Sequence, residues 1–271
     1  QHEGPEIRIP ATDNIMDMTA LQKIRWVYSH NPSWNILWLM FYMDPAFQTD
    51  PEARYREMRE LFYQQGCVSP VMYLECQKIL QVRPALLARA GQFELQVLHF
   101  AVKYDQLTRE QASLLGQLVL ELNGADLEPA EQKMAAQILR YADQKFPDRE
   151  ILHALCRMLI AAQDEDPAGH GYFHRAIRDE IREDAIFNYY FHTLDTSVMD
   201  PLLPEALEYF LEHTELLYDH QSYVYANLIQ NKFSNPEIYH RSMETVTSYA
   251  EYQMSQGQNN PWLAIIFKEF L

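Results

Sequence analysis

Residues 128–145 read EPAEQKMAAQILRYADQK and show a pattern that recurs along nearly the whole chain. Met134, Ile138 and Tyr141 lie three or four positions apart, so they share one face of a helix, and charged residues occupy the other face. Pro129 near the start is typical of a first helical turn. The segment is therefore predicted to be an amphipathic helix that buries its apolar face against a neighbour.

The same signals predict helices throughout the sequence. Apolar residues recur at three- and four-residue steps, and N-cap residues such as Ser33, Ser69 and Thr108 precede the runs. No stretch alternates between apolar and polar residues cleanly enough to be a strand. The expected helices span 15–29, 34–44, 51–65, 70–82, 84–105 (with a break at Gly91 as an alternative), 108–123, 129–145, 149–163, 168–183, 185–195, 204–218, 222–232, 235–256 and 260–270.

Alternate helices follow a regular spacing. They are expected to begin near residues 34, 70, 108, 149, 185, 222 and 260, which gives a repeat of about 38 residues built from two helices. Helix pairs of this kind cannot bury their apolar faces alone and stack on their neighbours. The predicted fold is therefore all-α, a right-handed α-α superhelix or solenoid of about six to seven helix pairs.

The two ends of the chain suggest how the domain is organised. Residues 1–12 contain Gly4, Pro5 and Pro10 and are expected to be an extended tail or a linker from a preceding domain. Residues 13–271 are expected to form a single helical-repeat domain. Because the first residue is Gln and the last repeat has no partner helix, we expect a domain excised from a longer chain. Packing of 260–271 as a cap is the alternative.

Composition limits the possible classes of function. The 271 residues include 22 Lys and Arg against 38 Asp and Glu, so the net charge is −16. This charge repels nucleic acid and anionic lipid, so neither is an expected partner. The hydrophobic content of 48% excludes a disordered chain. Residues 195–271 are the most acidic part, which fits either a basic partner or a solvated surface.

Hydrophobic runs and cysteines bear on the compartment. No apolar run is long enough to span a bilayer, so no membrane insertion is expected. Cys67, Cys76 and Cys156 show no CxxC spacing, so neither a disulfide framework nor a zinc site is indicated. Free buried thiols fit a reducing compartment, and we expect the chain to be cytoplasmic.

Three stretches resemble the tetratricopeptide repeat. Trp34-x-x-Leu37-Trp38-x-x-Phe41 follows the order of its first helix, except that Trp38 stands where a small residue is usual. Further partial matches are Leu152-x-x-Leu155-Cys156-x-x-Leu159 and Tyr225-x-Asn227-Leu228-x-Gln230. The resemblance implies tetratricopeptide-like helix pairs. In such solenoids the first helices line a concave groove, which is the default surface for a protein or peptide.

A more specific resemblance covers nearly the whole span. The chain resembles an uncharacterised family of very large proteins from gut Clostridia, known only as a domain of unknown function. The resemblance rests on Trp26-Val27-Tyr28-Ser29-His30-Asn31-Pro32, Gly66-Cys67-x-Ser69-Pro70-Val71-x-Tyr73-Leu74-Glu75 and Tyr225-Ala226-Asn227-Leu228-Ile229. It implies a helical middle region with flanking domains on both sides, and it supplies no catalytic residue.

Catalytic motifs are missing from the sequence. No GxGxxG, GxxxxGK[ST], GxSxG or HExxH pattern occurs. Asp164-Glu165-Asp166 with His170 and His174 has the composition of a metal site, but an acidic turn that opens a helix is favoured. No metal and no cofactor are therefore expected.

Two other groups of reactive side chains have a simpler explanation. The carboxylates within 179–184 are expected to form salt bridges with neighbouring arginines on a solvated face rather than to act as acid and base. Cys156 and His153 lie three apart on one helix, but the apolar residues around Cys156 favour a packed core thiol over a nucleophile. No catalytic residue is predicted.

Polar side chains on the first helices of the pairs are the candidate binding residues. Asn227 and Gln230 lie where tetratricopeptide repeats that hold peptide carboxylates place polar side chains, and an asparagine amide both donates and accepts hydrogen bonds. The same amides could instead bond a neighbouring helix or water. The complete set of candidate peptide-binding residues is Asn35, Arg157, Asn227, Gln230 and Asn231.

An acidic stripe is the other candidate surface. The stripe lies on the expected helix 204–218, opposite its apolar face, and suits either a basic partner or solvation alone. Its members are Glu205, Glu208, Glu212 and Glu215. The sequence therefore predicts a non-enzymatic helical-repeat scaffold that binds a protein or peptide, or spaces flanking domains in a larger protein. The alternative is an α/α-toroid enzyme acting on carbohydrate, because aromatic residues are plentiful at helical spacing.

Overall fold

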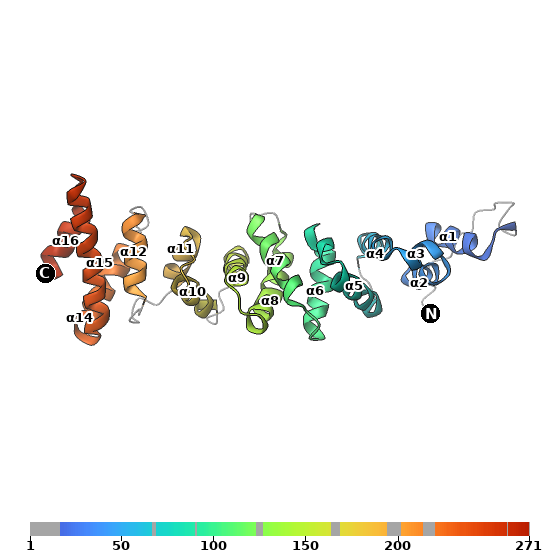
Figure 1. The fold of residues 1–271 in the computed structure, drawn as a ribbon, viewed down its shortest axis with the longest axis horizontal. Helices are drawn as coiled ribbons and strands as arrows, with labels where there is room; N and C mark the ends of the chain where they lie inside the picture. Colours follow the sequence, from blue (N-terminus) through green and yellow to red (C-terminus); the bar gives the residue numbers. More distant parts are fainter. Residues whose placement is uncertain are drawn as a thin grey trace, which may run out of the picture. The chain divides into compact units, whose positions relative to one another are not determined.

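The computed structural model describes residues 17–66, 69–89, 91–122, 127–163, 169–193, 202–213, 220–258 and 260–270. Every regular element in these ranges is helical (Figure 1), so the prediction of an all-α fold is confirmed. The tail expected at 1–12 lies outside the described residues. The chain divides into two compact units, with the boundary between Leu118 and Val119.

The described helices of the two units range from 5 residues in α3 to 20 in α15. Unit 1 contains α1 (Ala20–His30), α2 (Trp34–Met43), α3 (Pro45–Thr49), α4 (Pro51–Gln65), α5 (Pro70–Val82), the 3₁₀ helix η2 (Pro84–Arg89) and α6 (Gln92–Lys103). The boundary falls within α7 (Arg109–Glu121). Unit 2 contains α8 (Pro129–Lys145), α9 (Arg149–Ala161), α10 (Gly169–Arg178), α11 (Asp184–Thr193), α12 (Leu203–Glu212), α14 (Gln221–Ser234), α15 (Pro236–Ser255) and α16 (Pro261–Phe270).

Capping side chains set the helix starts. The Ser33 hydroxyl accepts a hydrogen bond from the Ile36 N–H at 3.4 Å, where the sequence predicts the start of α2. Thr19 and Gln22 form a reciprocal capping box, with distances of 2.8 and 3.3 Å. Because Thr19 caps the helix, α1 begins at Ala20 and not at residue 15 as predicted.

Other predicted helices also differ from the structure. The helix expected over 204–218 ends at Glu212, with His213 as its C-cap. The range 84–105 is split into η2 and α6, with Gly91 as the N-cap, so the break at Gly91 is confirmed. The helix expected over 168–183 ends at Arg178, because Glu180 adopts a left-handed backbone with a φ of 59°. The short helix α3, which Asp44 caps, was not predicted.

Helices in each unit pack on their neighbours along the chain. In unit 1, α1 packs on α2, α4 packs on α5 and α6, and α5 packs on α6. In unit 2, α8 packs on α9, α9 on α10 and α11, α10 on α11 and α12, and α12 on α14 and α15. Contact with both the next helix and the next but one is the arrangement of a solenoid.

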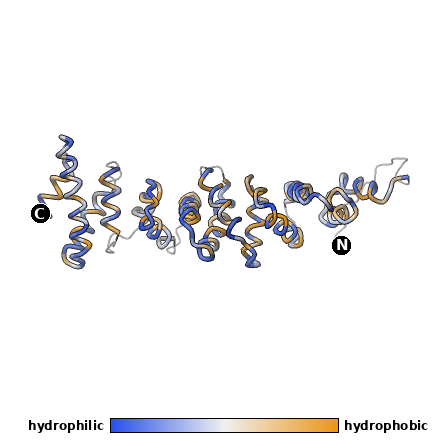
Figure 2. Tube along the Cα trace, viewed as in Figure 1, coloured by the Kyte–Doolittle hydropathy of each residue, from blue (hydrophilic) through white to orange (hydrophobic). Residues whose placement is uncertain are grey.

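The predicted repeat is visible in the helix starts. The first helices of the successive repeats begin at Trp34, Pro70, Arg109, Arg149, Asp184, Gln221 and Pro261, which keeps the spacing of about 38 residues. Apolar and polar residues alternate along these helices (Figure 2), as amphipathic stacking requires. The prediction of an α-α solenoid of six to seven helix pairs is confirmed.

Buried polar side chains join helices about one repeat apart. The Gln77 and Gln111 amides, 34 positions apart, bond each other at 2.9 Å. The Arg175 guanidinium bonds Asp143 across 32 positions at 2.5 Å, and Asp143 is 2% exposed. These bonds satisfy polar groups that would otherwise be costly to bury, and they fix which turns of successive repeats lie side by side.

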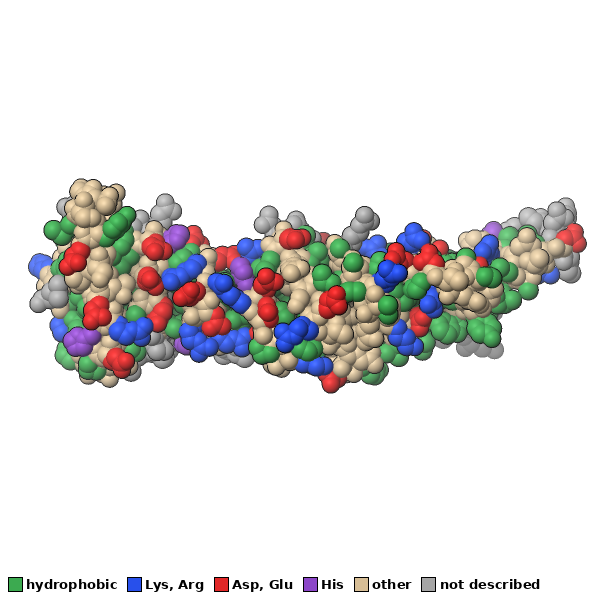
Figure 3. All heavy atoms as spheres, viewed as in Figure 1, with side chains coloured by type: hydrophobic (Ala, Val, Ile, Leu, Met, Phe, Trp, Pro, Cys, Tyr) green, Lys and Arg blue, Asp and Glu red, His purple; other side chains and the backbone are tan. Residues whose placement is uncertain are grey.

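The four tryptophans are divided between the units. Trp26 lies on α1, Trp34 and Trp38 lie on α2, and Trp262 lies on α16. Trp262 is 5% exposed, whereas Trp38 is 43% exposed. Trp38 belongs to an exposed apolar face of α2, and Figure 3 shows apolar side chains gathered on this part of unit 1. α2 has only 10 residues, and none of the described helices is long and apolar enough to cross a membrane.

Gly66→Ala tests the end of α4. Gly66 has a φ of 71°, and a left-handed backbone costs a residue with a Cβ about 1 kcal/mol. We expect the substitution to lower the free energy of unfolding by about 1 kcal/mol, measured by urea denaturation with circular dichroism.

Gly171→Ala is the matched control. Gly171 lies inside α10, and no atom lies within 4 Å of an added Cβ. Alanine favours a helix, so this variant is expected to gain about 0.5–1 kcal/mol. Equal effects at the two glycines would contradict the assignment of strain to Gly66.

Candidate functional site

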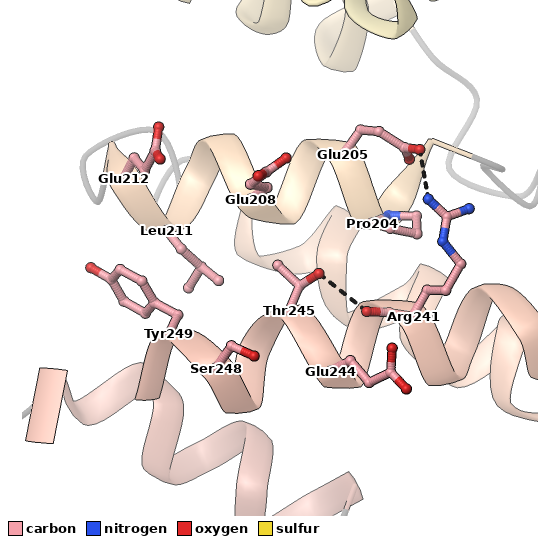
Figure 4. Close-up of a pocket in the computed structure, with 10 residues that line it drawn as sticks. All are labelled: Pro204, Glu205, Glu208, Leu211, Glu212, Arg241, Glu244, Thr245, Ser248 and Tyr249. Atoms are coloured by element: carbon pink, nitrogen blue, oxygen red, sulfur yellow. Dashed lines mark hydrogen bonds and ion pairs between the residues drawn. The ribbon is translucent and has the colours of Figure 1, made fainter. Parts of the chain in front are cut away.

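A groove lies between α12 and α15, which pack on each other within unit 2. Its volume is about 520 Å³, within the range of ligand pockets. We call it the α12–α15 groove, and Figure 4 shows its lining side chains. They are Pro204, Glu205, Glu208, Leu211, Glu212, Arg241, Glu244, Thr245, Ser248 and Tyr249.

The acidic wall of the groove follows from the amphipathic sequence of α12. Leu207 and Phe210 are fully buried, so the glutamates three and four positions apart are turned to the surface. Figure 4 shows Glu205, Glu208 and Glu212 on successive turns of α12, and Figure 3 shows acidic side chains gathered over this helix. Three members of the predicted stripe thus line one groove, and Glu215 lies outside the described residues.

The opposite wall comes from α15. In Figure 4, Arg241, Thr245 and Tyr249 rise from successive turns of this helix. The Thr245 hydroxyl donates to the Arg241 carbonyl at 3.1 Å, and the Tyr249 oxygen accepts from the Gln253 amide at 2.8 Å. Leu211 faces Tyr249 between the two walls, and its side chain is almost completely buried.

Charges in the groove are only partly compensated. Arg241 bonds Glu205 at 3.0 Å, and Arg182, which precedes α11, bonds Glu208 at 3.0 Å. Glu212 and Glu244 make no ion pair or hydrogen bond with any residue that the structure describes. The lining therefore carries four carboxylates against one guanidinium, so its potential is negative.

Burial and the negative potential of the groove affect Glu205 and Tyr249. The Glu205 Oε2 atom is buried without a hydrogen-bond partner. Burial raises the pKa of Tyr249, and the negative charge of Glu212 adds to the rise. A positively charged group in the groove would meet open acceptors on both walls.

The predicted binding amides lie elsewhere, on α14. Asn227 and Asn231 are both 0% exposed. The Asn227 amide donates to the Tyr223 carbonyl at 3.1 Å, and the Asn231 amide donates to the Asn227 carbonyl at 2.9 Å. Gln230 is half-buried beside them. These two amides therefore bond the backbone of α14 itself, whereas the alternative expected from the sequence is a bond to a neighbouring helix or to water.

The other two predicted binding residues are separated. Arg157, on α9, donates through Nε to Glu183 at 3.1 Å and through Nη1 to the Leu120 carbonyl at 3.0 Å. Asn35 is exposed on α2 in unit 1. None of the five predicted residues lines the α12–α15 groove.

A charged cluster joins α9 to the segment before α11. His153 Nε2 lies 2.5 Å from a Glu183 oxygen, beside the Arg157 contact. Burial alone would raise the pKa of Glu183, but the hydrogen bonds from His153 and Arg157 lower it below its ordinary value of 4.5. The contact between His153 and Glu183 thus joins α9 to the segment before α11.

The cysteines are packed inside the units. Cys76 and Cys156 are free and 0% exposed, as predicted, and Cys67 lies outside the described residues. Burial raises the pKa of both thiols. A protonated, enclosed thiol is a poor nucleophile, which favours the core role for Cys156.

The predicted metal-like cluster is largely outside the described chain. Asp164, Glu165, Asp166 and the side chain of His170 lie there. Among the side chains that are described, no group of three or more His, Cys, Asp or Glu is placed to hold a metal ion.

Comparison with known protein families identifies a family that matches this chain. The N-terminal part of DUF5717, a family of unknown function, matches residues 11–271. The chain belongs to this family. The resemblance to a family of unknown function is thereby confirmed, while occurrence in very large Clostridia proteins stays a prediction. No curated protein and no solved structure matches this DUF5717 chain.

Glu183→Gln tests the cluster through pH. The native pKa of Glu183 is lowered, so its contribution to stability is present above the unfolded pKa, near 4.5, and is lost as pH falls through the native pKa. We expect Glu183→Gln to lower the free energy of unfolding by about 1–2 kcal/mol at pH 7 and to have little effect at pH 3. Urea denaturation at both pH values measures this, and an equal loss at both would contradict it.

Asn227→Ala tests whether the buried amide is structural. Removing a buried hydrogen-bonded amide is expected to cost about 1–3 kcal/mol of stability. Asn35→Ala, at an exposed position, should change stability by less than about 0.5 kcal/mol. Thermal unfolding of the two variants measures the difference, and equal stabilities would assign Asn227 no structural role.

Proposed function

We propose that this chain is a non-enzymatic, tetratricopeptide-like scaffold that binds a basic protein or peptide segment in the α12–α15 groove. The observation that carries the proposal is the charge of that groove, four glutamates against one arginine, with Glu212 and Glu244 unpaired among the described residues. Lysine and arginine side chains are the groups that such a surface attracts.

The shape of the groove suits a chain segment of this chemistry. Glu205, Glu208 and Glu212 lie along α12, so successive cations on a partner helix or extended strand meet successive carboxylates. The half-buried ring of Tyr249 offers an apolar surface to the aliphatic stems of lysine or arginine. Electrostatic contacts of this kind raise the association rate and weaken as salt screens them.

Other features support the same class of function. Solenoids present long surfaces that bind partners, and the helices within each described unit stack in this way. The net charge of −16 opposes nucleic acid as the partner. Free buried cysteines support a reducing compartment such as the cytoplasm. Spacing of flanking domains is the role that remains if no basic segment binds.

Glu212→Gln with Glu244→Gln tests the groove, because neither side chain holds another element in place. The probe is a fluorescent 16-residue peptide of repeated Lys-Leu-Ala-Ala units, followed by anisotropy. We expect the double variant to bind it about five- to tenfold more weakly, since each exposed charge contact contributes up to about 1 kcal/mol. Raising NaCl from about 0.05 M to about 0.5 M should weaken the wild-type complex.

Glu121→Gln with Glu269→Gln is the matched control. Both positions are exposed and lie outside the groove. The two substitutions remove the same charge as the pair in the groove. Equal losses in the two double variants would show that net charge alone attracts the peptide. Equal binding of a Glu-Leu-Ala-Ala peptide, or no binding of the lysine peptide to the wild type, would also overturn the proposal.

A further inference from the structure

A second cavity lies in unit 1, between α4, η2 and α6. Its volume is about 370 Å³, which is enough for a small molecule. It differs from the α12–α15 groove because it contains a buried polar network and two arginines. Its lining residues fall into a polar wall from α4 and α6 and an apolar wall from η2.

Glu94 organises the polar wall. Its side chain is 1% exposed, and it accepts hydrogen bonds from the Tyr55 hydroxyl at 3.1 Å, Arg59 Nε at 2.8 Å and the Gly91 N–H at 2.9 Å. Both carboxylate oxygens are therefore engaged. Glu94 serves as the anchor of the network and is not open to a cation.

Arg59 is held in one orientation. Its Nε bonds Glu94, and its guanidinium carbon lies 5.0 Å from the centre of the Tyr63 ring. Its two terminal nitrogens make no hydrogen bond with a described residue. A guanidinium fixed along one edge, with its other donors open, is preorganised to bind a planar anion.

Arg56 lies one turn earlier on α4 and also lines the cavity. It makes no ion pair or hydrogen bond within the described ranges, although its charge partly offsets the rise in the pKa of Glu57 that burial and Glu60 cause. Glu60 is the acid left open on the same wall. It also lies near α1, because burial and the charges of Glu57 and Glu60 raise the pKa of Tyr28 to about 12.

The facing wall is apolar. Ala85, Leu86 and Ala88 of η2 line it. An inorganic anion would leave this wall in contact with water, whereas a carboxylate attached to a short hydrocarbon would cover it. The open donors and the apolar wall thus select the same kind of molecule.

We propose that this cavity binds a small organic carboxylate, whose charged group meets Arg56 and Arg59 and whose hydrocarbon part packs on η2. The site is independent of the groove in unit 2. It needs no movement of Glu94, because that residue already holds Arg59 in place from the polar wall.

The probe for the experiment is hexanoate, titrated against the full chain by saturation-transfer NMR. We expect saturable binding to the wild type and binding about tenfold weaker in Arg56→Ala, since a charge-assisted hydrogen bond is lost. Arg56 is exposed and makes no ion pair or hydrogen bond among the described residues, so this variant should keep the wild-type circular dichroism spectrum. Arg59→Lys, which keeps the charge but not the planar donor edge, should also weaken binding.

Lys78→Ala is the control, since Lys78 is exposed on α5, outside the cavity lining, and carries the same charge as Arg56. Equal weakening in Arg56→Ala and Lys78→Ala would overturn the site, as would no binding of hexanoate. Hexylamine that binds as tightly as hexanoate would overturn the role of the arginines. Inorganic phosphate that binds as tightly would overturn the role of the apolar wall.

Discussion

Burial of each helix's apolar face by the helices next to it in the chain is the constraint on which the rest of the structure depends. In α9, Ile151, Leu155 and Leu159 are each 0% exposed, and α9 packs on α8, α10 and α11. The contacts are therefore local along the chain, and the polar bonds obey the same rule, as Gln77 with Gln111 illustrates. Both candidate sites also lie between elements about one repeat apart, because such elements are the ones that meet.

Most of the fold could be predicted because its signals are local. Ser33 before α2 and Pro129 at the start of α8 act within one turn, and the repeat length follows from counting such starts. The predicted helix boundaries are wrong where tertiary contacts or the local backbone conformation determine where a helix begins or ends. Nothing in the sequence around Glu180 announces a left-handed residue that ends α10. Likewise Thr19 shortens α1 through a capping box that competes with several equally acceptable starts.

Only one of the two walls of the α12–α15 groove could be predicted from the sequence. The acidic stripe of α12 is visible in the spacing of Glu205, Glu208 and Glu212, but its partner wall on α15 is not, because the pairing of the two helices is tertiary. Arg241 opposite Glu205, 36 positions later, is a signal only once the repeat is known. Asn227 shows the reverse problem. The sequence pattern of a polar residue at helical spacing is the same in both cases: when the side chain faces a groove, and when it bonds the backbone of its own helix inside the core.

The placement of the tryptophans makes the two units optically distinguishable. Unit 1 contains Trp26, Trp34 and the exposed Trp38, whereas unit 2 contains only the buried Trp262. In a chain with phenylalanine at the first three positions, tryptophan emission would come from unit 2 alone, at the shorter wavelengths of an enclosed indole. Its emission, followed beside circular dichroism of all the helices, would separate the melting of α16 and its neighbours from that of the rest. Comparing Trp262 emission with circular dichroism would thus measure whether the repeats unfold together.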